Sequence, residues 1–439
     1  MKRVLVITYY WPPSGGAGVQ RWLKFTKYLP EFGWQPVVYT PENPEAPVDD
    51  PSLSKDIAPQ AEILKRRILE PYSLYKKFVG MRSDDRINAG FLNENEKSQK
   101  KEGISVWIRG NLFIPDARKF WINPSVRFLK KYLKENPVDA IISTGPPHSM
   151  HLIARRLKKH FNLPWIADFR DPWTEIDFYD QLRLTPGSDR KHKALEKAVL
   201  KEADEVVVIG KTMAERFKSA AGITPLVIAN GYDEADFFHK KQKPATEPGK
   251  ELTIVHVGAM NRDRNHVIFW EAIAELMKVE PQLATQITIK LVGKLDVSVL
   301  QSISDFNMKE QVEIQSHLPH DQIIPLLQSA ALLYLPINNT PNARSIQPGK
   351  LFEYLAAGRP ILGIGPVDGD AAEILRGCNA GEMIDFSDKT QLIKVLEKWF
   401  QLHNDGQLSI EPTGRDKYTR KNLTSTYSEV LDRIISKAP

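Results

Sequence analysis

Two residues with complementary chemistry, Lys350 and Glu353, stand close together near the start of a predicted helix. The surrounding segment, residues 348–360, opens with Pro-Gly and closes with Gly-Arg-Pro, which limits the helix at both ends. Free backbone N–H groups and the dipole at the helix start, together with the lysine ammonium, suit a phosphate. The glutamate can accept hydrogen bonds from a vicinal diol such as a ribose, so the pair indicates a nucleotide site. An ordinary helix with a favourable acid in its first turn would show the same pattern.

A glycine-rich loop near the start of the chain offers a second candidate contact for a phosphate. An apolar strand is predicted over residues 4–8, and helical spacing follows the loop. The loop contains Gly15, Gly16 and Gly18. Glycines let the backbone approach a phosphate closely, and the next helix start supplies N–H donors. The spacing differs from the G-x-G-x-x-G pattern of dinucleotide cofactors, although Glu42 lies where such a fold has its ribose acid. A tight turn without a ligand is the alternative.

Two further loops at strand ends carry a histidine and two carboxylates. Residues 139–143 form a predicted strand whose following loop holds His148, and a second buried strand ends at Asp168. Arg170 and Asp171 come directly after it. Because parallel strands have their carboxyl ends at one edge of a sheet, we expect these side chains to share a rim with the glycine loop. Such a group suits a polyhydroxy substrate. A structural histidine, and ion pairing between the aspartates and the arginine, are the alternatives.

Arginines follow the first predicted strand of the second half of the chain, residues 253–257. Gly258 ends that strand, and Arg262 and Arg264 lie in the loop behind it. A guanidinium can grip a diphosphate through two parallel hydrogen bonds. These arginines are therefore predicted to bind a diphosphate, and simple exposure to solvent is the alternative.

The elements that must position these residues alternate between strands and helices in both halves of the chain. This alternation predicts an α/β protein with two Rossmann-like, doubly wound parallel sheets. We expect a first domain over 1–242, with a partly ordered insertion over 43–102, and a Lys-, Pro- and Glu-rich linker at 240–250. A second domain over 243–410 and a final helix within 411–439, which crosses back to the first domain, complete the prediction.

Composition describes an ordinary globular protein. Of 439 residues, 42% are hydrophobic and 26% are charged, which excludes a disordered chain. The single cysteine, Cys378, excludes an intramolecular disulfide and a cysteine-built zinc site and favours a reducing compartment, the cytoplasm. No apolar run approaches the roughly 18 residues of a membrane-spanning helix. The net charge of +6 favours acidic partners without choosing among nucleotides, anionic lipids and nucleic acid.

The segment 118–134 is basic and aromatic and contains no acidic residue. Its apolar residues recur at helical spacing, and Asn123-Pro124 predicts a helix start. An amphipathic helix of this kind is typical of a contact with anionic lipids at a membrane surface. The alternative is a solvated helix with one buried face.

Taken in this order, the features resemble one known family. The chain is similar to the family 4 glycosyltransferases of GT-B fold, a retaining group that includes enzymes of lipopolysaccharide, capsule and exopolysaccharide assembly. The resemblance rests on the glycine loop, on Asn230-Gly231-Tyr232-Asp233 before the linker, and on the segment 348–360. It covers both domains apart from residues 43–102.

The resemblance gives several residues an expected donor-binding role. Gly15 and Gly16 match the glycine loop that faces the donor phosphate and the acceptor. Arg262 and Arg264 stand where the family has its basic, diphosphate-binding pair, although Ala259 replaces the usual arginine directly after the glycine. Glu353 matches the second of two signature glutamates, the one that holds the donor ribose.

Ser345 stands where the first signature glutamate, which contacts the sugar, is expected. This departure resembles a subgroup with a Pro-small-Lys-Leu-Phe-Glu-Tyr sequence, which Lys350 fits. His148, Asp168 and Asp171 resemble that subgroup's acceptor-side loops and are predicted as catalytic residues.

The motif Asp368-Gly369-Asp370 has the D-x-D form of metal-dependent glycosyltransferases of another fold. It follows a predicted strand in a glycine-rich loop, so we interpret it as a turn and expect no metal ion.

The expected activity is transfer of a sugar from a nucleoside-diphosphate donor to a lipid-linked saccharide acceptor, with retention of the anomeric configuration. The nucleotide sugar is a substrate, and no cofactor and no nucleic-acid partner are expected. The protein is expected in the cytoplasm, peripherally at the inner face of the membrane. A nucleotide-sugar epimerase of the same fold is one alternative. A non-catalytic partner of a polysaccharide-assembly complex is another, because Ser345 replaces a glutamate, and a dehydrogenase is the third.

Overall fold

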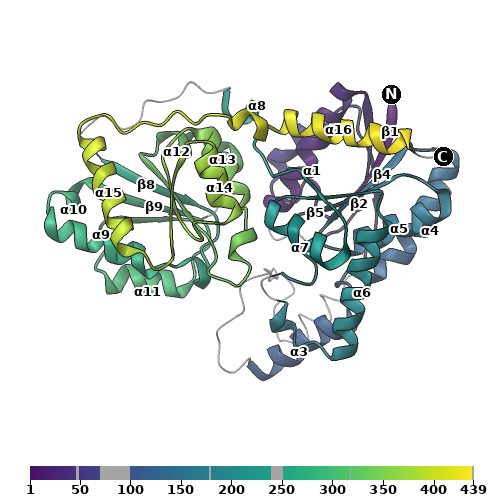
Figure 1. Cartoon of the computed structure of the whole chain (residues 1–439), viewed down its shortest axis with the longest axis horizontal. Helices are drawn as coiled ribbons and strands as arrows, with labels where there is room; N and C mark the ends of the chain where they lie inside the picture. The colour runs from purple at the N-terminus through teal and green to yellow at the C-terminus, as the bar shows by residue number, and fades with distance from the viewer. Residues whose placement is uncertain (46–48, 70–98, 177–178, 239–250, 317, 438–439) are drawn as a thin grey trace. The chain divides into compact units, whose positions relative to one another are not determined.

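The computed structural model describes residues 1–45, 49–69, 99–176, 179–238, 251–316 and 318–437. The chain divides into two compact units, and Figure 1 labels the helices and strands of both. The first unit consists of Met1–Ala229 and Arg420–Pro439, and the second of Asn230–Thr419. The linker expected at 240–250 lies outside the described residues.

The sheet of the first unit has the strand order β3-β2-β1-β4-β5-β6-β7, and its neighbouring strands are parallel. The strands are β1 (Lys2–Ile7), β2 (Trp34–Pro41), β3 (Glu62–Arg66), β4 (Ala140–Gly145), β5 (Trp165–Phe169), β6 (Glu205–Val208) and β7 (Leu226–Val227). In the middle of the sheet, Val6 of β1 lies opposite both Val38 and Ile142. Continuous apolar runs of this kind fit strands that are covered on both faces.

Alternate residues of β1 enter two separate cores, because successive side chains of a strand point to opposite faces. Leu5 and Ile7 belong to a core with residues of α4 and α5, whereas Val4 and Val6 belong to a core with residues of α1 and α16. The helices of this unit include α1 (Ala17–Tyr28), α3 (Gln99–Leu112), α4 (Lys119–Glu135), α5 (Ser149–Phe161), α6 (Pro186–Glu202), α7 (Lys211–Ala221) and α16 (Arg420–Ser436).

The last helix, α16, returns to the first unit, which confirms the predicted course of the chain. It lies beside α1, as Figure 1 shows in yellow and purple. Leu423, Tyr427 and Leu431 of α16 are buried in the core that also contains Trp22 and Phe25 of α1. The ring of Tyr427 packs against both aromatic rings, with centroid distances of 5.3 Å to Trp22 and 4.8 Å to Phe25.

Two elements differ from the sequence predictions. Within the insertion predicted over 43–102, β3 forms an edge strand parallel to β2, so part of this segment belongs to the sheet. Charged side chains in β3 hide its apolar pattern and suit an edge strand. Residues 70–98 lie outside the described residues. The predicted start of α4 at Asn123-Pro124 is wrong, because the buried side chains of Trp121 and Ile122 extend that helix to Lys119.

The sheet of the second unit has the order β10-β9-β8-β11-β12-β13, again with parallel neighbours. The strands are β8 (Leu252–Val257), β9 (Ile287–Val292), β10 (Val312–Gln315), β11 (Leu332–Pro336), β12 (Ile361–Ile364) and β13 (Gly381–Ile384). The helices include α8 (Glu234–Phe238), α9 (Val267–Val279), α10 (Leu283–Gln286), α11 (Val297–Asp305), α12 (His320–Ser329), α13 (Gly349–Ala357), α14 (Asp370–Gly377) and α15 (Lys389–Asn404). One core joins the strands to α9, α11 and α15.

Two Rossmann-like parallel sheets with a returning C-terminal helix confirm the predicted fold class. Among the described residues, no helix combines the length and the apolar character that crossing a membrane requires.

Candidate functional site

The start of α13 meets the carboxyl end of β8 in the second unit. Lys350, in the first turn of α13, extends over Gly258, the residue that follows β8. A Cβ atom on Gly258 would lie 2.8 Å from Lys350 Nζ, so any other residue here would displace the ammonium group. Gly258 also has a φ of +113°, a conformation that other residues rarely adopt. Lys350 Nζ lies 3.3 Å from Nε2 of the buried His256.

Charge gathers around this lysine. Burial, and then the neighbouring positive charge of Arg264, hold the pKa of Lys350 well below its usual value, while the Glu353 carboxylate opposes the shift. The structure therefore brings together three of the predicted donor-binding residues, Arg264, Lys350 and Glu353. The cluster has two positive side chains and one negative one, so an anionic ligand would balance its charge.

The two predicted arginines have different surroundings. Arg264 donates from Nε to Asn338 Oδ1 at 2.5 Å and from a terminal nitrogen to the Ala259 carbonyl at 2.9 Å, which holds its guanidinium beside the end of β8. Arg262 lies in the same short 3-10 helix, Arg262–Arg264, but is exposed. Arg264 is therefore the arginine that the fold fixes next to Lys350.

Ser345 lies in a 3-10 turn, Ala343–Ser345, and is buried. Its hydroxyl donates to the Asn342 carbonyl at 2.8 Å and so stabilises the turn. The neighbouring Arg344 is exposed and forms an ion pair of 2.8 Å with Asp368. These contacts give Ser345 a structural role, and its predicted contact with a donor stays a prediction.

The Asp368-Gly369-Asp370 segment forms the turn into α14. The Gly369 N–H donates to the Pro366 carbonyl at 3.1 Å, and Asp370 is the first residue of the helix. The Asp370 carboxylate accepts a hydrogen bond of 3.4 Å from the Gln347 amide. Both aspartates thus have protein contacts.

In the first unit, Arg170, which follows β5, connects the first turn of α1 with the end of β4 and the loop after it. Its guanidinium donates to the Gly18 carbonyl at 2.9 Å, to the Gly145 carbonyl at 3.4 Å and to the Pro146 carbonyl. The loops after β1, β4 and β5 therefore do meet at one edge. In the glycine loop, Gly16 precedes α1 with a φ of +90° and is exposed, whereas Gly15 is buried.

His148 lies at this edge, before the first turn of α5, and is only 6% exposed. Its ring stacks on Trp173 with a centroid distance of 4.8 Å and an interplanar angle of 2°. Burial, together with the nearby His151, Arg170 and His192, holds the pKa of His148 well below its usual value, so the ring is neutral. A neutral imidazole can accept a proton or hydrogen-bond a hydroxyl, which is compatible with the predicted acceptor-side role.

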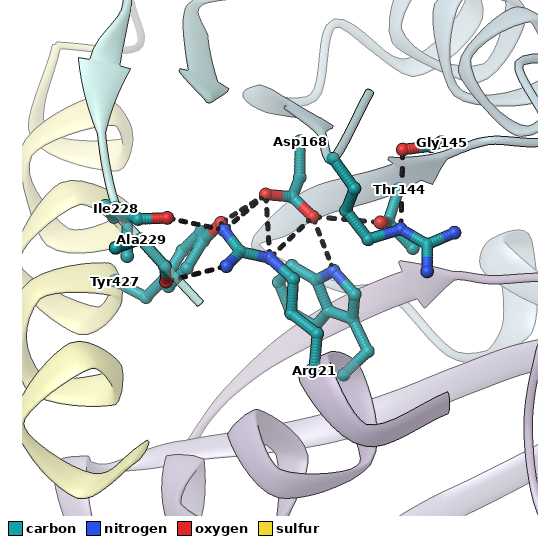
Figure 2. A network of polar contacts seen from close by, with 9 residues as sticks. Arg21, Thr144, Gly145, Asp168, Ile228, Ala229 and Tyr427 are labelled. Carbon is teal, nitrogen blue, oxygen red and sulfur yellow. Dashed lines mark hydrogen bonds and ion pairs between the residues drawn. The ribbon is translucent and has the colours of Figure 1, made fainter. Parts of the chain in front are cut away.

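Asp168 differs from the prediction. Instead of facing the rim, its carboxylate lies fully buried beneath it, at the centre of the network in Figure 2. It pairs with Arg21 at 2.8 Å and accepts hydrogen bonds from Thr144, Trp22 and Tyr427 at 2.8, 2.7 and 2.6 Å. Although burial alone would raise it, the Arg21 charge and these hydrogen bonds lower the pKa of Asp168 to about 2.

Asp168 therefore has no accessible face for a substrate, and we correct its predicted catalytic role to a structural one. Asp171 has the opposite environment, because it is exposed and its charge acts on the neighbouring Arg170. Of the two predicted carboxylates, only Asp171 lies at the rim.

Sequence reasoning missed Arg21, Tyr427, Trp173 and His256. Arg21 interrupts the apolar face of α1, and His256 is a titratable residue in a strand whose other members are four apolar residues and Thr253. Both irregularities are visible in the sequence. Their partners are not, because the Arg21–Asp168 and His256–Lys350 contacts join residues far apart in the chain.

Comparisons with known proteins agree with this architecture. The family description "Glycosyl transferases group 1" matches residues 251–401, and "Glycosyltransferase Family 4" matches residues 91–236. A search of curated proteins finds no match.

Several solved structures have the same fold at low sequence identity. A sucrose-phosphate synthase from Thermosynechococcus elongatus is 13% identical over 100% of both chains, with a TM-score of 0.64. WaaG, a glycosyltransferase involved in lipopolysaccharide biosynthesis, is 13% identical over 98% of this chain and 99% of its own, with a TM-score of 0.58. HepE from Anabaena, in complex with UDP-glucose, is 13% identical over 100% of this chain and 99% of its own, with a TM-score of 0.56.

Proposed function

The chain belongs to the family 4 glycosyltransferases of GT-B fold, and from this we propose that it transfers a sugar from a nucleoside-diphosphate donor to a hydroxyl of a saccharide acceptor. The family resemblance supports retention of configuration at the anomeric carbon. The nucleotide sugar bound by the similar HepE structure supports the class of donor.

The observation that carries this proposal is the cluster of Arg264, Lys350 and Glu353 at the carboxyl edge of the second sheet. Negative charge develops on the diphosphate as its bond to the sugar breaks, and donors fixed in a partly buried site stabilise that charge strongly. Lys350 and Arg264 are held for this task, since each has a fixed hydrogen-bond partner. Glu353 lies three residues after Lys350 in α13, beyond the first turn, and can accept hydrogen bonds from the ribose.

We propose that the reaction needs no metal ion, because Lys350 and Arg264 supply positive charge to the diphosphate. The aspartates of the D-x-D segment support this proposal, since Asp368 pairs with Arg344 and Asp370 contacts Gln347. Transfer is expected to persist in an excess of a strong chelator. Complete loss that magnesium restores would contradict metal independence while leaving the transferase proposal intact.

The acceptor is proposed to bind at the rim of the first unit, near His148 and Asp171. His148 is neutral and Asp171 is exposed, so the rim offers both a hydrogen-bonding imidazole and a carboxylate to sugar hydroxyls. The glycine loop with Gly15 and Gly16 lies at the same edge of the first sheet, which supports its proposed position beside the acceptor.

A panel of nucleoside-diphosphate sugars incubated with the purified protein and saccharide acceptors tests the function. We expect one donor to give a glycosylated acceptor and free nucleoside diphosphate. A changed sugar without an acceptor product would indicate the epimerase, and binding without turnover of any donor would indicate the non-catalytic partner. Nicotinamide-dependent oxidation would indicate the dehydrogenase.

Two matched variants connect this activity to the cluster. Lys350→Met is expected to lower the rate of transfer by about 10²- to 10³-fold, the typical effect of removing one group that stabilises developing charge. Lys398→Met removes the same charge from an exposed position on α15 and is expected to leave the rate unchanged. Equal rates for wild type and Lys350→Met would show that the cluster does not bind the donor.

We further propose that the first unit binds an anionic membrane surface, which would bring the enzyme to a lipid-linked acceptor. Not all of the predicted 118–134 segment is open to a membrane, because Arg118 and Trp121 are buried. Phe120 is 52% exposed, and Leu112 at the end of α3 is 54% exposed. Lys119 lies over the Phe120 ring at 5.1 Å and donates to the Leu112 carbonyl, so apolar and basic groups meet at this corner.

Flotation with lipid vesicles tests the membrane proposal. The exposed face of α4 carries Arg127, Lys131 and Lys134. Wild type is expected to float with vesicles that contain anionic lipid and not with purely zwitterionic ones. The double variant Lys131→Glu/Lys134→Glu is expected to stay in the soluble fraction, whereas Lys398→Glu on α15 should behave as wild type. If the wild-type protein did not float with anionic vesicles, the membrane proposal would be wrong.

A further inference from the structure

We infer that His256 is a positioning residue that aims the Lys350 ammonium group at the donor diphosphate. This inference rests on the proposed function, because it presumes that a diphosphate binds at Lys350. His256 lies in β8 and is completely buried, so it cannot itself contact a substrate. Its influence must therefore pass through the side chain that it touches.

The backbone fixes which ring nitrogen of His256 carries the proton. Nδ1 lies 3.0 Å from the Tyr334 carbonyl oxygen of the adjacent strand β11. A carbonyl oxygen only accepts hydrogen bonds, so Nδ1 is the protonated nitrogen and Nε2 presents a lone pair. The Lys350 ammonium, 3.3 Å away, is the donor to that lone pair.

A second contact shows that the same face of α13 is fixed to the same strand. Tyr354, one turn after Lys350, accepts a hydrogen bond of 2.9 Å at its hydroxyl from the Val257 N–H. Residues four apart on a helix share a face, so Tyr354 fixes the body of α13 while His256 fixes the end of the lysine side chain. Gly258 supplies the space in which the ammonium lies.

The charges around the pair explain why a histidine suits this position. Burial and the positive charges of Lys350 and Arg264 keep the pKa of His256 well below its usual value, although the carbonyls of Tyr334 and Gly258 oppose the shift. The ring therefore stays neutral. A neutral acceptor orients the ammonium without cancelling its charge, whereas an aspartate in the same place would form an ion pair and compete with the diphosphate.

Three substitutions of His256 separate positioning from folding. His256→Gln can accept from Lys350 at one end of its amide and donate at the other. His256→Asn can keep the contact with Tyr334 but is too short to reach Lys350, and His256→Phe removes both contacts. Affinity for UDP, ADP and GDP is measured by titration calorimetry, with thermal unfolding as the control for folding.

For whichever nucleotide wild type binds, we expect His256→Asn and His256→Phe to lose about tenfold in affinity and His256→Gln to recover most of it. The affinity of wild type should fall as the pH rises through the lowered pKa of Lys350. In His256→Phe that midpoint should lie at lower pH, because the ammonium has lost an acceptor. A merely structural histidine would not move this profile.

A double-mutant cycle with Lys350→Met identifies the path of the effect. On the Lys350→Met background, substitution of His256 is expected to change nucleotide affinity less than twofold. Wild-type affinity in a folded His256→Asn or His256→Phe variant, or an undiminished effect on the Lys350→Met background, would overturn the inference alone. Absence of nucleoside-diphosphate binding by wild type would overturn the proposed function and the inference together.

Discussion

The carboxyl edges of the two sheets differ in the partners that they give to a cation, Arg21 in the first unit and Lys350 in the second. In the first unit, the Arg21 guanidinium faces the Asp168 carboxylate at 2.8 Å and adds hydrogen bonds to the carbonyls of Ile228 and Ala229. In the second unit, the Lys350 ammonium has the neutral His256 ring as its hydrogen-bond partner. The pKa shifts differ accordingly, because the pKa of Arg21 is raised while that of Lys350 is lowered.

From this difference we infer that Arg21 stabilises the fold, whereas Lys350 is placed to bind the proposed diphosphate. The ion pair of Arg21 and Asp168 is buried within the network of Figure 2, so it exposes no group to a substrate. The Lys350 ammonium is partly buried beside a neutral ring and a second cation, so an incoming anion would stabilise its charge. Groups with perturbed pKa values of this kind are typical of functional sites. Similar topology thus gives the two edges opposite electrostatic roles.

Among the substitutions that test this difference, Asp168→Asn is expected to have the largest effect on stability. The amide leaves the Arg21 charge buried without its counter-ion, so we expect the free energy of unfolding to fall by about 3–5 kcal/mol. Urea unfolding followed by tryptophan fluorescence measures the change. Asp171→Asn, at an exposed position on the same loop, should stay within about 0.5 kcal/mol of wild type. Equal losses in both variants would show that burial of Asp168 is not the cause.

The contribution of the same ion pair to stability should depend on pH. The pKa of Asp168 is lowered from 3.8 to about 2, so its stabilising contribution is present above pH 4 and is lost as the pH falls through 2. This contribution amounts to about 2 kcal/mol. The stability difference between wild type and Asp168→Asn should therefore shrink as the pH falls from 6 to 2. A difference that is independent of pH would contradict the assignment.

Tyr427→Phe tests the part of the network that the last helix supplies. The hydroxyl donates to Asp168 at 2.6 Å and accepts from Arg21 at 2.9 Å, so its removal should lower stability by about 1.5 kcal/mol. Hydrogen exchange should accelerate in α16 more than in β8. Tyr418→Phe, a tyrosine of the second unit, provides a matched control that should leave exchange in α16 unchanged.

The smallest stability effect, with the opposite sign, is expected for Lys350→Met. A lysine whose pKa is lowered by folding destabilises the folded state while it stays protonated, and methionine removes that charge but keeps the apolar stem. We expect the free energy of unfolding at pH 7 to be unchanged or to rise by up to about 1 kcal/mol, although the rate of transfer falls. A clear loss of stability would place Lys350 among the structural cations, with Arg21.

Local patterns account for what the sequence could predict. The apolar strands and helix boundaries around Gly258 and 348–360 follow from short-range propensity, and they predict a helix whose start carries Lys350 at the carboxyl end of β8. The edge strand β3 escaped prediction because its charged residues give no apolar alternation. It becomes a strand through pairing with β2, which is a tertiary effect.

Long-range pairing explains the errors within the site. The sequence predicts that Asp168 faces the rim, with ion pairing to Arg170 as the alternative. In the structure, Asp168 instead contacts Arg21 and Tyr427, which lie near the two ends of the chain. Arg170 instead donates to backbone carbonyls. The sequence shows that a charged residue lies at the end of a strand. Where its side chain points depends on which helices, distant in the sequence, pack beneath it.

The Arg21 side chain hydrogen-bonds to the carbonyl of Ala229, the last residue before the chain enters the second unit. It also hydrogen-bonds to Tyr427 of α16, the helix with which the chain returns to the first unit. During synthesis, therefore, the first unit cannot finish its interior until Arg420–Pro439 has left the ribosome, whereas Asn230–Thr419 is a single continuous stretch that can fold earlier. The unit whose synthesis begins first is therefore completed last, and until then Trp22 and Phe25 lack their contact with the Tyr427 ring.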